Sequence, residues 1–147
     1  AKLTDAPQAW YVGARRSLTG LNADVWVPAK NGGELAIVRA LLGAVGRSSG
    51  VSLAQAAEAA GVEEAQLSAL AERLRDGGRS LIVAGTTGPD AKAVALAVAE
   101  LNKALGNVGV TVKPSEALLS YERLNTAAQF RDAVERMAAG SVPVVFV

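Results

Sequence analysis

The sequence predicts an α/β fold in which helices cover both faces of a doubly wound, mainly parallel sheet. Two observations lead to this prediction. Short apolar runs typical of strands are separated by stretches in which apolar residues recur at helical spacing. Half of the 147 residues are hydrophobic, which is enough to build a sizeable core in one domain covering residues 1–147.

Strands are predicted where short apolar runs are bounded by turn residues. In chain order these runs are residues 9–12, 24–27, 80–85, 109–113 and 144–147. The run Ser-Leu-Ile-Val-Ala-Gly at 80–85 is the clearest, because it is apolar on both faces and leads into a glycine, as a buried parallel strand does. We expect residues 144–147 to lie parallel to it, beside or near it.

Helices are predicted where apolar residues follow a 3.6-residue period between capping signals. They cover residues 34–45, 52–60, 63–76, 89–105 and 127–139. Ser52 is the expected N-cap of the second of these helices, and Gly61 is its expected C-terminal stop. The second and third helices form a helical hairpin inserted between strands.

The composition excludes several kinds of chemistry. The chain has no cysteine and no histidine, so disulfides, thiolate or imidazole metal sites, Fe–S clusters and histidine-based catalysis are excluded within it. Only carboxylate, lysine, tyrosine or hydroxyl chemistry remains, and we expect no catalytic residue and no metal site in this chain. A net charge of +1 does not favour a nucleic-acid partner, and no apolar run approaches the eighteen residues that direct membrane insertion requires.

The helical hairpin at residues 51–74 imitates a helix-turn-helix, the motif that many proteins use to bind DNA. The second helix would then contact the DNA, yet it begins with Glu63 and Glu64, which repel phosphates. No arginine or lysine precedes Arg73 in that helix. An ordinary helical hairpin is therefore the favoured interpretation, and DNA binding remains an alternative.

Two loops occupy the position where α/β proteins bind phosphates, between a strand and the following helix. One is residues 85–88 and the other is residues 31–34. Neither has the pattern of a P-loop or of a dinucleotide fingerprint, so plain turns are favoured over ligand sites. A small basic patch of Arg15, Arg16 and Lys30 is best explained as solvated surface.

Three stretches resemble the molybdopterin oxidoreductase family. Residues 17–28 (Ser-Leu-Thr-Gly-Leu-Asn-Ala-Asp-Val-Trp-Val-Pro) are similar to the passage before the family's Arg-Pro-Gly-Thr-Asp loop, and residues 81–85 are similar to its next central strand. Residues 101–109 (Leu-Asn-Lys-Ala-Leu-Gly-Asn-Val-Gly) resemble its Leu-Asn-x-x-Leu-Gly-Asn-x-Gly turn. The residues of these stretches are most similar to those of the iron–sulfur large subunit of alternative complex III, a quinol-oxidising respiratory complex.

The resemblance implies a set of cofactor-binding positions that have become vestigial. They are Lys30, Gly33, Glu34, Gly85, Thr86 and Asn107. Family members that hold the bis-pterin cofactor have an Arg-Pro-Gly loop followed by an Asp that contacts the guanine, whereas this chain has Lys-Asn-Gly-Gly-Glu at residues 30–34. Lysine lacks the forked geometry of arginine. The resemblance therefore implies no cofactor in this chain and Fe–S clusters elsewhere in its parent.

The main functional hypothesis is a structural α/β segment of the large subunit of a respiratory electron-transfer complex. The resemblance implies other subunits of a membrane-associated complex as partners and a position peripheral to the membrane, on the periplasmic side. The chain does not begin with Met and stops inside an apolar run, so we expect it to be a fragment. The alternatives are a guanine-nucleotide-contacting segment of a true bis-molybdopterin oxidoreductase and a small helix-turn-helix-like or ligand-binding module.

Overall fold

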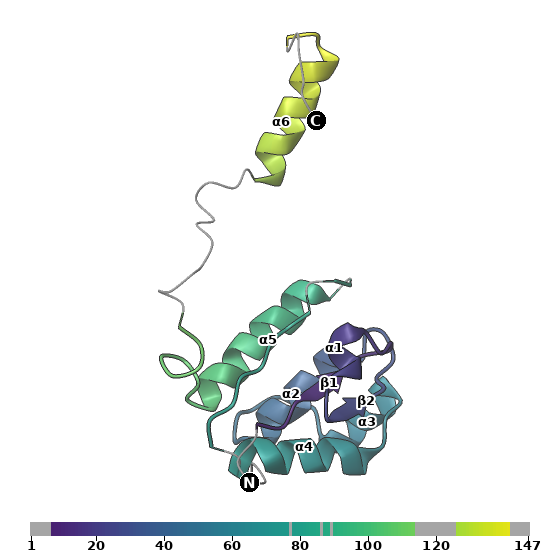
Figure 1. The fold of residues 1–147 in the computed structure, drawn as a ribbon, viewed down its shortest axis with the longest axis vertical. Coiled ribbons are helices and arrows are strands. Elements are labelled where there is room, and N and C mark those ends of the chain that lie inside the picture. Colours follow the sequence, from purple (N-terminus) through teal and green to yellow (C-terminus); the bar gives the residue numbers. More distant parts are fainter. Residues whose placement is uncertain (1–6, 77, 86, 89, 114–125, 142–147) are drawn as a thin grey trace. The chain divides into compact units, whose positions relative to one another are not determined.

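The structure is a computed structural model that describes residues 7–76, 78–85, 87–88, 90–113 and 126–141. The chain divides into two compact units, Ala1–Pro114 and Ser115–Val147, which are described separately below. The helices and strands of the described residues are labelled in Figure 1. They are β1 Trp10–Val12, α1 Leu18–Leu21, β2 Val25–Val27, α2 Glu34–Ala44, α3 Leu53–Ala60, α4 Glu64–Asp76, α5 Ala91–Ala104 and α6 Ala127–Ala138.

The strands β1 and β2 form a parallel two-stranded sheet, which confirms the strands predicted near residues 9–12 and 24–27. Tyr11 is paired with Trp26 in the register. The connection between the strands contains the single-turn helix α1, which the sequence did not predict. The turn forms because the Ser17 hydroxyl accepts a hydrogen bond from the Gly20 amide at 3.2 Å.

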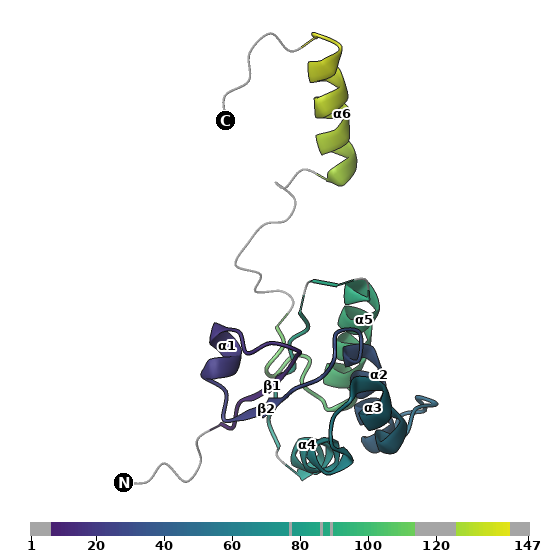
Figure 2. The same cartoon turned by 90° about the vertical axis from the view of Figure 1, so that its right-hand side faces the viewer.

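Four helices of the first unit surround one apolar core. Helix α2 packs against α3, α4 and α5, and Figure 2 shows α2, α3 and α5 on one side of the sheet with the short α1 on the other. The largest side chains that are fully buried come from four different elements: Val27, Ile37, Leu67 and Leu101. The described residues therefore form a mixed, mainly helical unit with a small parallel sheet.

The helical hairpin is confirmed. Ser52 and Gln55 form a capping box at the start of α3, in which each side chain bonds the main-chain N–H of the other. Helix α3 ends at Gly61, whose φ of 65° is the left-handed conformation that glycine adopts most readily. Helix α4 follows and packs against α3, as predicted.

Residues 80–85, predicted as the central strand, do not form a strand in the structure. Residues 81–85 pair with no other strand of the described chain, because the described sheet contains only β1 and β2. The main chain of Ile82 is instead hydrogen-bonded to the Asn102 side chain. Figure 1 shows this segment running alongside α5.

The strand predicted at residues 109–113 is also wrong. The amides of Val110, Thr111 and Val112 all donate to the Asn107 carbonyl at 2.9–3.1 Å, and these bonds curl the chain into a tight turn. A single bridge joins Val108 and Val112. The chain forms a turn here and not a strand, because Gly109 adopts a φ of 83°, which lies outside the range of extended strands.

The second unit contains α6, which confirms the helix predicted at 127–139. Thr126 and Gln129 form a capping box at its start. One side of the helix carries Phe130, Val134 and Met137, all exposed. The strand predicted at 144–147 and the candidate site residue Thr86 lie outside the described residues.

No helix within the described part of the chain is long and apolar enough to cross a membrane.

Candidate functional site

The first unit contains a cleft of about 1800 Å³ between β1 and the segment 81–85. One wall is β1 with the loop that follows it, and the other wall is residues 79–85 with residues 87 and 88. The cleft is also lined by apolar side chains of α2, α4 and α5, among them Val38, Leu41, Leu70, Leu74, Val94 and Val98. These side chains give the middle of the cleft an apolar lining.

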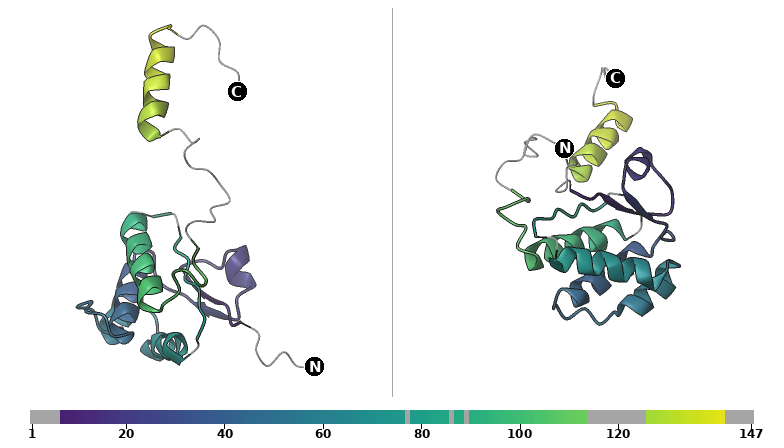
Figure 3. Two further views of the ribbon diagram at one scale, coloured as in Figure 1. Left: turned by 90° about the vertical axis from the view of Figure 1, so that its left-hand side faces the viewer. Right: turned by 60° about the horizontal axis from the view of Figure 1, so that its bottom comes forward.

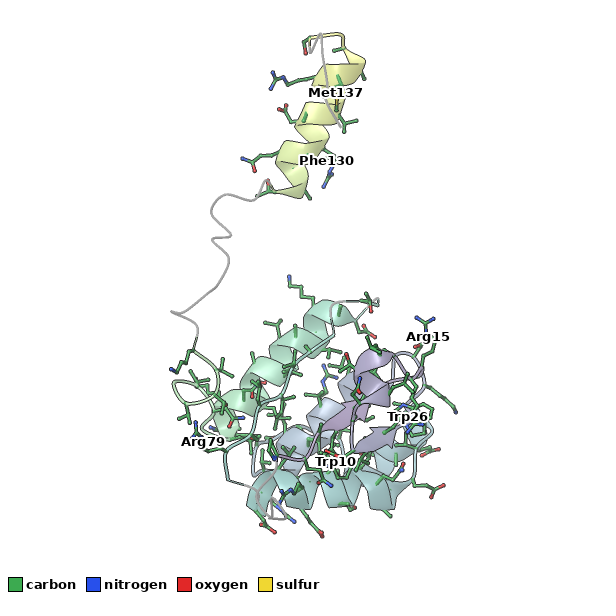
Figure 4. All side chains as sticks on the ribbon, viewed as in Figure 1. Trp10, Arg15, Trp26, Arg79, Phe130 and Met137 are labelled. Carbon is green, nitrogen blue, oxygen red and sulfur yellow. The ribbon has the colours of Figure 1, made fainter. Side chains whose placement is uncertain are left out.

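Several charged groups line the cleft. Figure 4 shows Arg15 and Arg79 far apart, at opposite ends of the first unit. The lining also includes Glu34, at the start of α2, and Asp90, directly before α5.

The cleft brings together only some of the predicted site residues. Glu34 and Gly85 both line it, together with Asn31, Thr87 and Gly88 of the same two loops. Lys30, Gly33 and Asn107 do not line it. The two strand-to-helix loops singled out in the sequence therefore face one space, while the remaining candidates lie elsewhere.

Residues 30–34 are held by contacts within the unit. The Lys30 amide donates to the Ala60 carbonyl at 2.8 Å, and the Glu34 carboxylate accepts from the Gly32 amide at 2.8 Å. Gly33 is buried against Ala60, so that a Cβ at residue 33 would lie 2.6 Å from the Ala60 Cα. The loop thus joins the start of α2 to the end of α3.

Asn107 belongs to a buried polar cluster that also contains Asn102, Ser80 and Thr111, referred to below as the asparagine cluster. Asn102 accepts from the Ile82 amide at 3.2 Å and donates to the Ile82 carbonyl at 2.8 Å. Asn107 donates to Asn102 Oδ1 at 2.9 Å and to Ser80 Oγ at 3.0 Å. Thr111 donates to the Ser80 carbonyl, so the cluster holds residues 80–82 against the end of α5.

Sequence reasoning singled out Asn107 but missed Asn102. Both residues lie within the stretch 101–109 that carries the family resemblance, and both are buried, with 5% and 3% of their surfaces exposed. The five-residue spacing of two asparagines around a helix end was the available signal. Asn102 is in the last turn of α5, and Asn107 follows the helix.

The basic and aromatic residues of the first loop contact each other. The Arg16 guanidinium lies 5.1 Å from the centre of the Trp26 ring, a distance typical of a cation–π contact. The Trp26 indole N–H donates to the Gly13 carbonyl at 2.9 Å. Arg15 and Lys30 are exposed, as predicted for a solvated surface.

Within the described ranges, no three Asp or Glu side chains gather in a way that could hold a metal ion. Every buried side-chain nitrogen and oxygen of those residues has a hydrogen-bond partner. Comparison with protein-family models, with curated proteins and with solved structures finds no match to this chain.

Proposed function

We propose that the chain is a structural α/β segment of the large subunit of a respiratory quinol-oxidising complex, as its resemblance to the molybdopterin oxidoreductase family implies. The asparagine cluster is the observation that carries the proposal. The most distinctive stretch of the resemblance, residues 101–109, uses both of its asparagines for internal hydrogen bonds. A motif used in this way supports a role in scaffolding.

Residues 30–34 support the same role. In a cofactor-holding relative, the matching loop would present an arginine and an aspartate to the guanine. Here the Glu34 carboxylate bonds the Gly32 amide of its own loop, and Gly33 allows α2 to begin close to the end of α3. These contacts serve the fold of the first unit.

Two further parts of the proposal concern the sheet of the parent protein and the location of that protein at the membrane. We propose that additional parallel strands complete a doubly wound sheet in the parent, with electron transfer carried by Fe–S clusters elsewhere. The segment would lie peripheral to the membrane, on the periplasmic side, in contact with other subunits of the complex.

Analysis of the intact parent protein tests the proposal. A tagged parent is purified from its native membranes, and its molybdenum, iron and released pterin are measured together with its co-purifying subunits. We expect iron and partner subunits without stoichiometric molybdenum or pterin. One molybdenum and two pterins per chain, or a parent that purifies alone without iron, would contradict it.

A second candidate is a segment of a true bis-molybdopterin enzyme that contacts guanine nucleotide. It is favoured by one observation: Glu34 and Gly85, on loops far apart in sequence, line one cleft. The starts of α2 and α5 also line this cleft and would favour an anion. Direct measurement of GDP binding, described in the Discussion, separates the two candidates.

A further inference from the structure

The loop that joins β2 to α2 contains the only asparagine of the sequence that a glycine follows, Asn31 before Gly32. The loop leads into α2, and Figure 3 shows α2, α3 and α5 gathered on one side of the strands. Asn31 and Gly32 are both exposed and line the cleft. The Asn31 side chain makes no hydrogen bond to any residue that the structure describes. Water therefore reaches a side-chain amide that has no partner within the described residues.

An asparagine that precedes a glycine can lose its side-chain amide without an enzyme. The glycine nitrogen attacks Cγ of the asparagine, and the new N–C bond closes a succinimide ring. The Cγ–Nδ2 bond breaks, and ammonia leaves with the proton that the glycine nitrogen has given up through water. Water then opens the ring at either carbonyl and leaves an aspartate or an isoaspartate. Glycine favours the reaction because it has no side chain that obstructs the attack and it allows many main-chain conformations.

The folded loop holds the two reacting groups apart. The Gly33 amide donates to the Lys30 carbonyl at 3.0 Å, and Gly32 has a φ of 87°. Among the described residues only glycines have a positive φ, so this is a type II turn, in which the residue at the position of Asn31 has a ψ of about +120°. Ring closure requires a negative ψ there, because only then do the Asn31 Cβ and the Gly32 nitrogen lie on the same side of the Cα–C bond. The turn must therefore open before Asn31 reacts.

The Glu34 carboxylate stabilises the closed turn. Its Oε2 accepts from the Gly32 amide at 2.8 Å, and this is the N–H that must lose its proton in the reaction. A hydrogen bond to a carboxylate is stronger than one between neutral groups, and the nearby negative charge opposes loss of the proton. Glu34 is fixed in turn, because it begins α2 and the Lys30 amide of the same loop is bonded to the Ala60 carbonyl.

We infer that Asn31 is a site of spontaneous deamidation and that Glu34 sets its rate by holding the Gly32 amide. The only co-reactant is water. Asn102 and Asn107 are poorer substrates, because both are buried and hydrogen-bonded and neither precedes a glycine. The inference does not depend on the proposed function.

The reaction would alter the start of α2 in two ways. Either product adds a negative charge to the loop that already holds Glu34. Isoaspartate also adds one carbon atom to the main chain between residues 31 and 32, in a loop where Gly33 is in tight contact with Ala60. The isoaspartate form should therefore unfold at a lower urea concentration than the unreacted chain.

Timed incubation of the full chain at mildly alkaline pH, followed by peptide mapping with mass spectrometry, tests the inference. We expect Asn31 to convert before the other asparagines, and to convert more slowly in buffer than in guanidinium chloride, where the turn is lost. In buffer, Glu34→Ala should accelerate the conversion by about fivefold or more, because losing a hydrogen bond to a charged group shifts an opening equilibrium by at least that factor. In guanidinium chloride the two chains should convert at the same rate.

Three further variants make the result specific. Asn31→Gln should abolish the conversion at this position, because the larger ring closes far more slowly. Glu34→Gln keeps an acceptor for the Gly32 amide but removes the charge, so its rate should lie between those of the wild-type chain and Glu34→Ala. Glu63→Ala changes an exposed carboxylate directly before α4 and should leave the rate unchanged.

Circular dichroism shows whether each variant is folded. Should Glu34→Ala lose its fold, Glu34→Gln decides: a faster conversion than in the wild-type chain supports the inference, and an equal rate overturns it. Earlier conversion of another asparagine would also overturn it, as would equal rates for the folded wild-type chain and a folded Glu34→Ala.

Discussion

At the scale of single residues, Asn102 is a buried polar side chain on whose hydrogen bonds the fold of the first unit depends. It is buried, and its amide group acts as a substitute for a neighbouring strand by bonding both main-chain groups of Ile82. Its Nδ2 also donates to the Val98 carbonyl at 3.1 Å. Such a residue stabilises the fold mainly because its removal leaves buried polar groups without partners.

We therefore expect Asn102→Ala to lower the free energy of unfolding by about 2–4 kcal/mol, the sum of several buried hydrogen bonds. Urea denaturation measures the change. Asn22→Ala is the matched control, because Asn22 is exposed and makes one hydrogen bond to Leu18, and its effect should stay below about 1 kcal/mol. Equal losses in the two variants would contradict the role assigned to Asn102.

Gly33 is needed for a close approach of two main chains. Its φ is −80°, so conformation alone would allow any residue there. A Cβ would, however, lie 2.6 Å from the Ala60 Cα and 3.1 Å from the Lys30 carbonyl oxygen, and main-chain atoms cannot move aside cheaply.

Gly33→Ala should thus lower the free energy of unfolding by about 1–3 kcal/mol, the usual effect of overpacking. Gly85→Ala is the control: no atom lies within 4 Å of the added methyl group, so the variant should be neutral or stabilised by up to about 1 kcal/mol. Thermal and urea unfolding of both variants check this, and an unchanged Gly33→Ala would show that the contact with Ala60 relaxes freely.

At the scale of elements, the helices owe their ends to local side chains. The capping box of α3 uses Ser52 and Gln55, and Gly61 ends the same helix. Helix α4 has Glu64 in its first turn and Arg73 and Arg75 in its last, which suits the helix dipole. Their boundaries follow from residues a few positions apart, which explains why sequence patterns found them.

Ser52→Ala should remove the side-chain acceptor for the Gln55 amide and lower the free energy of unfolding by about 1 kcal/mol. Ser48→Ala is the comparison, because Ser48 is exposed in a loop and belongs to no cap of the described helices. Urea titrations of the two variants give the difference directly. A loss in Ser48→Ala as large as that in Ser52→Ala would mean that the cap is not the cause.

At the scale of the whole molecule, the cleft can be tested for nucleotide binding. The cleft is lined by the starts of two helices, α2 and α5, and helix starts favour anions. The Glu34 carboxylate accepts a hydrogen bond from the Gly32 amide of its own loop. Residue 30 is a lysine and not an arginine.

We expect GDP to bind the full chain with a dissociation constant above about 1 mM, because residues 30–34 (Lys-Asn-Gly-Gly-Glu) contain no arginine fork that could bind it in a bidentate way. Isothermal titration calorimetry measures it. Micromolar binding that is lost in Glu34→Ala and kept in Glu63→Ala, a change at an exposed residue directly before α4, would overturn the scaffold proposal and favour the true molybdopterin enzyme.

The sequence by itself determined the helices α2 to α6, the strands β1 and β2, and the exclusions that follow from the lack of cysteine and histidine. These features depend on neighbours along the chain: Ser52 caps a helix because Gln55 is three residues away, and the period of apolar residues defines the buried face of α5. Local physical chemistry decides them before any tertiary contact forms.

Only the tertiary structure decided the conformation of residues 80–85 and the hydrogen-bonding roles of Asn102 and Asn107. The run 80–85 has the composition of a strand, but a strand needs a partner, and the described residues offer it the Asn102 side chain twenty positions away. The reason for a glycine at residue 33 likewise depends on Ala60. Such contacts join residues far apart in the chain, so no local pattern could reveal them.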